Sequence, residues 1–179
     1  VNVQKKDAIK ETDYIESLIN AIGNADTYDA LDNIYEEISE SILFNDHIKN
    51  TNSKKSKEIS SLDNYLRLNI DGYTVLVGKS NKQNDYLTTK LANDNDYWFH
   101  AKDIPGSHVI LRNNGDMPKL DILEKCASLA AYYSKAKFSS NVPVDYTLIK
   151  YVKKPNSSVP GYVIYTNQKT LYVQPSSGL

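Results

Sequence analysis

The spacing of apolar residues changes once along this 179-residue chain, near residue 60, and that change limits the folds open to it. Before residue 48 the apolar residues recur every three to four positions, which predicts amphipathic helices. After residue 61 they alternate with polar residues, which predicts strands. Helices followed by consecutive strands with short turns favour an α+β fold: an antiparallel or mixed sheet covered by helices, preceded by a small helical hairpin.

The first part predicts two helices. The first should end at Gly23-Asn24, a pair suited to a left-handed cap, and Asp26 or Thr27 should cap the second. A polar stretch at 49–60 has no apolar period and is typical of a linker. We therefore divide the chain into a helical end of a longer region (1–48), a linker (49–60) and a sheet domain (61–179).

Within 61–179, Asp71-Gly72 separates two alternating runs, 65–70 and 74–77, and supplies the positive φ angles of a tight hairpin turn. Asn84 or Asp85 is expected to cap a short helix reaching residue 92. Residues 120–137 predict the main helix, and strands are expected at 96–102, 108–111, 146–152, 161–165 and 171–173.

Charge is distributed unevenly. Residues 1–71 hold 8 Lys/Arg and 14 Asp/Glu, whereas residues 72–179 hold 13 and 8, together with 10 of the 14 tyrosines and the single tryptophan. Cations combined with aromatic rings are typical of a nucleic-acid surface, so we expect the two parts to face different partners. The single cysteine, Cys126, lies in an apolar helical pattern and is expected to be buried.

No apolar run approaches the length of a membrane span and no leader pattern is visible, so we expect no membrane contact and a cytoplasmic protein. The chain begins at Val1, and we expect it to be part of a longer protein.

The stretch 96–109 concentrates unusual residues. In a strand, Tyr97 and Phe99 point to one face while Asp96, Trp98 and His100 point to the other. An acid, an indole and an imidazole on one face indicate either a polar network or a ligand site.

Three chemistries compete for this stretch. His100 and His108 with Asp96 or Asp103 are possible metal ligands, but the spacing matches no metal signature. Asp96 orienting His100, with Ser107 as nucleophile, would resemble hydrolytic machinery, although Ser107 follows a Pro-Gly turn rather than a nucleophile elbow. A structural network, in which Asp96 accepts a hydrogen bond from His100 or from the Trp98 indole, is the third. We expect no catalytic residue, no metal and no cofactor.

Cations surround this stretch. Lys79 and Lys82 lie in a polar segment, and Lys102 and Arg112 flank the turn at 104–108, whose backbone N–H groups can face an anion. A third cluster comprises Lys150, Lys153 and Lys154, and in a strand Lys150 and Lys154 would share one face.

The chain resembles a known family in several segments that occur in order. They are 78–85 (GKSNKQND), 96–100 (DYWFH), 105–109 (PGSHV), 153–155 (KKP), 160–161 (PG) and 167–170 (NQKT). Together they closely resemble the NFACT-R domain, the RNA-binding C-terminal domain of the RqcH family, whose members are also called fibronectin-binding proteins. The resemblance covers about residues 62–175, and residues 1–45 look like the end of the helical middle region of that family.

The resemblance implies a noncatalytic RNA-binding module of a ribosome-associated quality control factor. Family members bind large ribosomal subunits obstructed by peptidyl-tRNA, recruit tRNA and support untemplated alanine tailing. Their Asp-Trp-His signature maps onto Asp96, Trp98 and His100. The N-terminal domains of the parent, with an Asp-Arg pair used in tRNA binding, lie outside this chain, so we expect no tailing by the chain alone.

The expected partners are tRNA or rRNA, the large ribosomal subunit and the other domains of the parent. The residues expected to bind RNA or to brace the site are Lys79, Lys82, Asp96, Trp98, His100, Lys102, Ser107, His108, Arg112, Lys150, Lys153 and Lys154. Two rivals stay open: an adhesion module that binds fibronectin by strand addition at a sheet edge, and a domain that docks on ribosomal protein.

Overall fold

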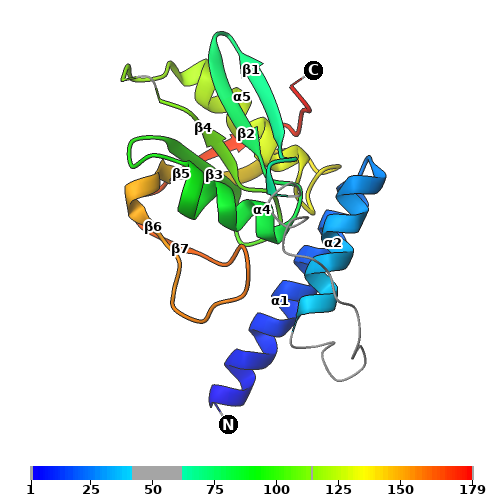
Figure 1. Ribbon diagram of the computed structural model, residues 1–179. Helices are drawn as coiled ribbons and strands as arrows, with labels where there is room; N and C mark the ends of the chain where they lie inside the picture. Colours follow the sequence, from blue (N-terminus) through cyan, green and yellow to red (C-terminus); the bar gives the residue numbers. More distant parts are fainter. Residues whose placement is uncertain (1, 42–61, 114, 179) are drawn as a thin grey trace.

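A computed structural model describes residues 2–41, 62–113 and 115–178. The chain forms a helical hairpin followed by a six-stranded sheet with helices on it (Figure 1). The helices are α1 (Asn2–Asn24), α2 (Tyr28–Glu40), α4 (Asn81–Tyr86) and α5 (Leu120–Tyr132), with a π-helical turn η1 (Leu87–Leu91) and a 3-10 turn η2 (Ile149–Tyr151). The strands are β1 (Leu66–Ile70), β2 (Tyr73–Val77), β3 (Tyr97–Ala101), β4 (Val109–Leu111), β5 (Val142–Leu148), β6 (Val152–Lys153), β7 (Ile164–Tyr165) and β8 (Lys169–Val173).

The main sheet has the order β1-β2-β4-β3-β5-β8, and each neighbouring pair is antiparallel. The predicted tight turn joins β1 to β2, with Asp71 at φ 49° and Gly72 at φ 89°. The α+β class, the antiparallel sheet and the preceding helical hairpin are thus confirmed.

The two faces of the sheet bury different cores. One face, with Phe99 and Val109, packs against α5, where Cys126 is fully buried as predicted. The other face, with Trp98 and Ile110, is covered by η1 and by residues around β6 and β7. This second face of the sheet is important because the candidate site lies on it.

The turn between α1 and α2 lies where it was predicted, but the left-handed cap expected at Gly23-Asn24 does not form, because neither residue has a positive φ. α1 ends at Asn24, and the Thr27 side chain caps α2 by accepting a hydrogen bond from the Ala30 N–H. The helices pack together through Tyr14, Leu18, Ala21 and Ile34. They also lie against the sheet domain, where the Asn81 amide donates to the Ser17 hydroxyl at 2.7 Å.

Several predicted boundaries are wrong, and of the strand expected at 161–165 only Ile164–Tyr165 (β7) forms. The short helix α4 is capped by Ser80, not by Asn84 or Asp85. The main helix α5 ends at Tyr132, because the Ser134 hydroxyl donates to the Ala131 carbonyl and the chain turns there. The strand expected at 146–152 is β5, which begins at Val142 and gives way to the 3-10 turn η2.

None of the helices in the described residues has an apolar stretch long enough to span a membrane. The predicted linker at 49–60 lies outside the described residues.

Candidate functional site

Strand β3 carries the centre of the candidate site. Its side chains alternate as predicted: Tyr97 and Phe99 belong to the core beneath α5, and Trp98 belongs to the opposite core. Trp98 is 0% exposed, whereas His100, two positions on, is partly exposed. The indole is therefore a buried support and not a surface ring.

Four aromatic rings meet on this face, from β3, β7 and the residue before β4. Between ring centroids, Trp98 lies 5.6 Å from the stacked His100 ring, 5.2 Å from the His108 ring, which is nearly perpendicular to it, and 4.7 Å from the Tyr165 ring. His100 and His108 are themselves 5.4 Å apart. We call Trp98, His100, His108 and Tyr165 the ring cluster.

The indole N–H of Trp98 is buried and has no hydrogen-bond acceptor among the described residues. Buried donors are nearly always paired, and an unpaired one costs about 1–3 kcal/mol. The Asp96 carboxylate does not supply the acceptor, so this part of the proposed polar network is wrong.

Asp96 has a different role from any expected for it. Its buried carboxylate accepts the N–H groups of Asn93 and Asn113, each at 2.8 Å, and pairs with Arg112 at 3.2 Å. It thereby ties the loop before β3 to the end of β4. Neither His100 nor Trp98 is its partner, and this arrangement does not orient an imidazole for catalysis.

The two histidines are held neutral. Burial lowers the pKa of His100 to about 4, although Asp145 and Asp103 act in the opposite direction. Burial and the neighbouring His100 also lower the pKa of His108. The ring cluster is thus uncharged at neutral pH.

His108 is held by hydrogen bonds to both its ring and its backbone. Its Nδ1 lies 2.7 Å from the Thr88 hydroxyl, and its backbone N–H donates to the Asn84 side-chain oxygen at 2.9 Å. Asn84 was expected to cap a short helix, but it lies within α4 and its side chain holds the residue before β4 instead. It lies so close to Gly78 that a Cβ there would be 2.2 Å from the Asn84 oxygen.

Ser107 is buried, and its N–H donates to the Tyr133 carbonyl at 3.0 Å. In the part of the chain that the structure describes, its hydroxyl has no hydrogen bond to either imidazole. The structure therefore gives no support to Ser107 as the nucleophile of a hydrolytic site. The described residues also contain no group of three His, Cys, Asp or Glu side chains placed to hold a metal ion.

A cavity of about 390 Å³ opens beside the ring cluster. Its walls come from α1, from the start of α4, from the turn at 104–106 and from the loop at 159–163. Figure 1 shows that loop, between β6 and β7, running beside α1. Apart from the neutral rings, the ionisable lining residues include one lysine, Lys10, and two carboxylates, Asp13 and Asp103. A phosphate would find little positive charge there, whereas a neutral planar group would find aromatic walls and amides.

The cations expected to contact phosphates fall into two groups. Four are engaged within the chain: Lys79 with Asp26 at 2.9 Å, Lys154 with Asp85 at 2.6 Å, Arg112 with Asp96, and Lys82 with Glu40. Lys102, Lys150 and Lys153 are exposed and have no ion-pair partner among the described residues. Lys150 lies in η2, so the strand face that it was expected to share with Lys154 does not form.

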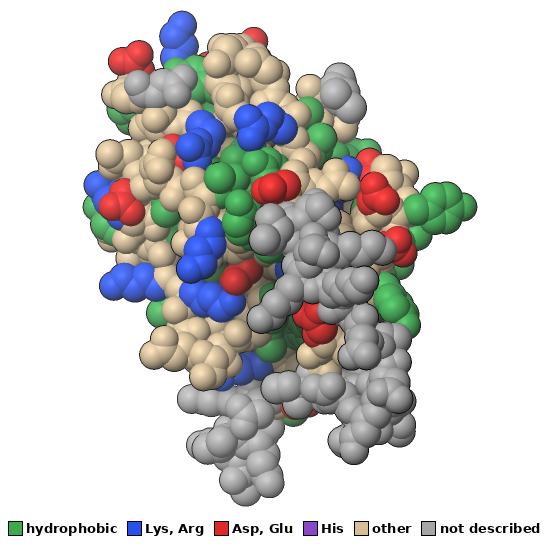
Figure 2. Space-filling view, viewed as in Figure 1, with side chains coloured by type: hydrophobic (Ala, Val, Ile, Leu, Met, Phe, Trp, Pro, Cys, Tyr) green, Lys and Arg blue, Asp and Glu red, His purple; other side chains and the backbone are tan. Residues whose placement is uncertain are grey.

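Figure 2 shows Lys and Arg interspersed with Asp and Glu on the face that it presents, without one continuous basic patch. Any phosphate contact on this face is therefore made by separate lysines.

Sequence reasoning missed two residues of the site, Tyr165 and its hydrogen-bond partner Asp145. Tyr165 donates to the buried Asp145 at 3.0 Å and closes the ring cluster from β7, and Gly161 lines the cavity at φ 76°. Their distance from β3 in sequence, more than 60 positions for Tyr165, hid this contact. The Pro160-Gly161 pair was visible only as part of the family resemblance.

Comparison with known proteins bears on these observations. Residues 64–166 match the family model described as the NFACT protein RNA binding domain. The chain is 41% identical over 177 residues to the Rqc2 homolog RqcH of Bacillus subtilis (strain 168), covering 99% of this chain and 30% of that protein. The Rqc2 homolog RqcH of Streptococcus suis (strain 05ZYH33) is 42% identical over 164 residues, covering 91% and 28%.

Among solved structures, the chain is similar to the C-terminal part of the fibronectin/fibrinogen-binding protein from Streptococcus suis, with a TM-score of 0.79 and 38% identity. The match covers 96% of this chain and 66% of that one. The chain thus spans about 30% of the length of the first of these curated relatives.

Proposed function

Because this chain belongs to the NFACT-R domains of the RqcH family, we propose that it is the noncatalytic RNA-contacting module of a ribosome-associated quality control factor. The observation that carries this proposal is the family match over 64–166, which contains the whole ring cluster and the exposed Lys102, Lys150 and Lys153. The chain then contributes binding and positioning, and the chemistry belongs to its partners.

In this proposal the phosphates are bound first by Lys102, Lys150 and Lys153, because these lysines are exposed and unpaired within the described residues. Lys79, Lys82, Arg112 and Lys154 would have to leave an intramolecular carboxylate before binding a phosphate. In the free chain these four cations are occupied by the carboxylates of Asp26, Glu40, Asp96 and Asp85.

The cavity beside the ring cluster is proposed to receive an unpaired base. A base would lie against the partly exposed rings of His100 and Tyr165, with Trp98 supporting them from beneath. His108, Ser107 and Asp96 act as braces, since each is buried and hydrogen-bonded to another segment of the chain.

The proposal also includes a cellular role for the parent protein, which is inferred from the relatives. We infer that the parent acts in the cytoplasm on large ribosomal subunits obstructed by peptidyl-tRNA, that this module contacts tRNA or rRNA there, and that it supports alanine tailing. The name RqcH of the relatives supports this inference. Tailing would also need the parts of the parent that this chain does not span.

The test is RNA binding by the 179-residue chain, measured by fluorescence anisotropy with labelled bacterial tRNA across a salt series. Each neutralised phosphate contributes about 0.7–0.9 to the slope of log K against log salt, so three free lysines predict a slope of about −2 to −3. Lys150→Ala should reduce that slope by about one contact. Lys125→Ala, which removes an exposed lysine paired with Asp71 at the β1–β2 turn, is the matched control and should not.

The proposal fails if the chain binds neither tRNA nor ribosomal RNA with salt dependence at low ionic strength. Fibronectin binding is the second candidate, supported by the name of the similar Streptococcus suis structure. The exposed edges of β1 and β8 would be its physical means. Fibronectin binding that persists at high salt, with no RNA binding, would select it.

A further inference from the structure

Phe138 is exposed to solvent on a hydrogen-bonded loop. Its side chain is 96% exposed, although burying a phenylalanine gains about 1.5–3 kcal/mol. The loop is fixed by hydrogen bonds from the Lys137 N–H to the Ser134 carbonyl at 3.1 Å and from the Ser139 N–H to the Ala136 carbonyl at 2.9 Å. The exposure is therefore a property of the folded loop and not of a frayed end.

A lysine and a second ring accompany Phe138. The Lys137 ammonium lies 4.2 Å from the centroid of the Tyr132 ring and 5.9 Å from that of Phe138. We call Tyr132, Lys137 and Phe138 the aromatic platform. Between residues 132 and 144 the sequence contains two lysines and no Asp or Glu. Within this basic segment Lys135 pairs with Glu16 of α1, so Lys137 is the cation of the platform.

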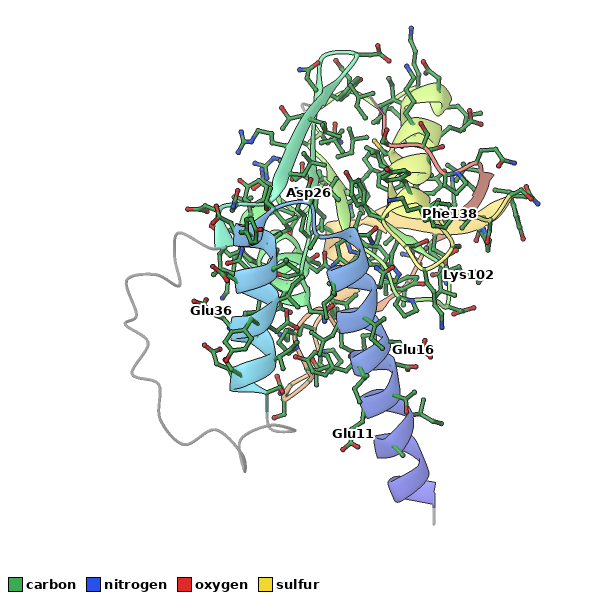
Figure 3. All side chains as sticks on the ribbon, turned by 90° about the vertical axis from the view of Figure 1, so that its right-hand side faces the viewer. Glu11, Glu16, Asp26, Glu36, Lys102 and Phe138 are labelled. Carbon is green, nitrogen blue, oxygen red and sulfur yellow. The ribbon has the colours of Figure 1, made fainter. Side chains whose placement is uncertain are left out.

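The aromatic platform is joined directly to the wall of the cavity. The Lys135 N–H donates to the Pro105 carbonyl at 2.9 Å, and Gly106 forms a β-bridge with Ser134. Pro105 and Gly106 both line the cavity. Figure 3 shows Lys102 and Phe138 on the same side of the domain. A strand of RNA leaving the cavity can therefore meet an exposed lysine and then an exposed ring.

We propose that the aromatic platform is a second RNA contact, which stacks an unpaired base of a single-stranded segment on Phe138 while Lys137 neutralises the adjoining phosphate. The inference rests on the proposed RNA-binding function and extends it beyond the ring cluster. Exposed rings with nearby cations bind single strands in this way, because every base has a face to stack. A protein partner is the competing occupant, and the test separates the two.

The probe is a fluorescein-labelled single-stranded RNA decamer of mixed sequence, bound by the 179-residue chain and followed by anisotropy at low ionic strength. Phe138→Ala should weaken binding about fivefold, the lower end of what one stacked base contributes. Phe138→Tyr keeps a ring and should bind like the wild type, whereas Phe138→Leu keeps apolar area without a ring and should behave like Phe138→Ala.

Tyr28→Ala is the matched control, because Tyr28 is 88% exposed on α2, beside Asp29 and away from the basic segment. It should leave binding unchanged. A decamer with abasic sites keeps the phosphates, so the effect of Phe138→Ala should disappear on it.

Two results overturn the inference alone: wild-type binding by Phe138→Ala, or equal weakening on the intact and the abasic decamer. If the wild type binds neither the decamer nor tRNA, the proposed function falls as well. Phe138→Leu that binds like the wild type would also overturn base stacking, since it would show that apolar area is sufficient, as for a docked protein.

Discussion

At the scale of single residues, Trp98 combines complete burial with an indole N–H that has no acceptor among the described residues. A buried donor of this kind is a cost, which the ring cluster offsets through contacts with His100, His108 and Tyr165. Trp98 therefore supports the site through its ring and its volume.

Two substitutions separate the ring from the N–H. Trp98→Phe keeps an aromatic ring and removes the unpaired donor, so the free energy of unfolding should stay within about 1 kcal/mol of the wild type. Trp98→Ala leaves a void in the buried cluster and should cost about 3–5 kcal/mol. Urea denaturation measures both. Equal destabilisation by the two variants would contradict the prediction that an aromatic ring at this position is sufficient.

The neutral His100 predicts a pH dependence of stability. Its pKa is about 4 in the folded chain and about 6.5 when unfolded. Below pH 6.5 the unfolded chain takes up a proton that the folded chain does not, so stability is complete above pH 6.5 and falls as pH drops toward 4. The carboxylates that face the ring, Asp145 and Asp103, reduce the effect without reversing it.

Between pH 7 and pH 5 we expect His100 to account for a loss of about 1–2 kcal/mol. Thermal unfolding of the wild type and of His100→Gln at both pH values tests this, and the variant should lose less stability. His108, whose pKa is lowered as well, gives the variant a remaining dependence of the same sign. An equal pH dependence in the two proteins would contradict the prediction.

The sequence predicted the features that depend on neighbouring residues, and it missed those that depend on contacts between distant segments. The alternation of Tyr97, Trp98 and Phe99 is local, and the assignment of their faces is correct. The partners of Asp96 are backbone N–H groups at Asn93 and Asn113, and the second lies 17 positions away. Such a contact depends on how the strands are paired, which no pattern of single residues encodes.

At the scale of elements, the start of α4 shows what sequence reasoning misread. Asn84 has the chemistry of a cap, but its side chain bonds the backbone of His108 and holds β4. The available signal was Ser80 followed by Gln83, a capping-box pattern. In the structure the Ser80 hydroxyl accepts the Gln83 N–H, and the Gln83 side chain accepts the Lys79 N–H.

The close approach of α4 to the end of β2 yields a prediction at Gly78. A Cβ there would lie 2.2 Å from the Asn84 side-chain oxygen, 2.9 Å from its backbone nitrogen and 3.1 Å from its Cα. Gly78→Ala should therefore cost more than about 2 kcal/mol of unfolding free energy, as overpacking does. It should also weaken RNA binding, because Asn84 positions His108.

Gly23→Ala is the control, since nothing lies within 4 Å of a Cβ at that position in α1. It should be neutral or stabilise the chain by up to about 1 kcal/mol, because alanine favours a helix more than glycine does. Chemical denaturation compares the two variants. A Gly78→Ala variant as stable as Gly23→Ala would mean that α4 is free to shift.

At the scale of the whole molecule, the two oppositely charged parts of the chain are partners of each other. The acidic hairpin pairs with the basic domain through Asp26 and Lys79, Glu40 and Lys82, and Glu16 and Lys135. In Figure 3 the labelled Asp26 lies where the hairpin meets the domain, and Glu36 lies on the outer side of α2. Charge asymmetry in a sequence does not tell whether the opposite charges meet within the chain or outside it.

This pairing predicts that the hairpin limits RNA binding by occupying lysines. Asp26→Asn combined with Glu40→Gln releases Lys79 and Lys82 and should raise RNA affinity at low salt. The salt slope should steepen by up to about 1.4–1.8, the contribution of two phosphates. Asp32→Asn with Glu36→Gln removes the same charge from α2 residues that have no ion pair within the described chain, and it controls for net charge.

Anisotropy titrations of both double variants against tRNA, over one salt series, decide the matter. A steeper slope only in the Asp26/Glu40 variant supports competition between the hairpin and RNA for the same two lysines. An equal gain in the two variants would mean that net charge alone acts, and no gain in either would mean that Lys79 and Lys82 stay on the protein. Because exposed ion pairs contribute only about 0–1 kcal/mol each, the released hairpin should remain folded, so that the affinities report on the lysines themselves.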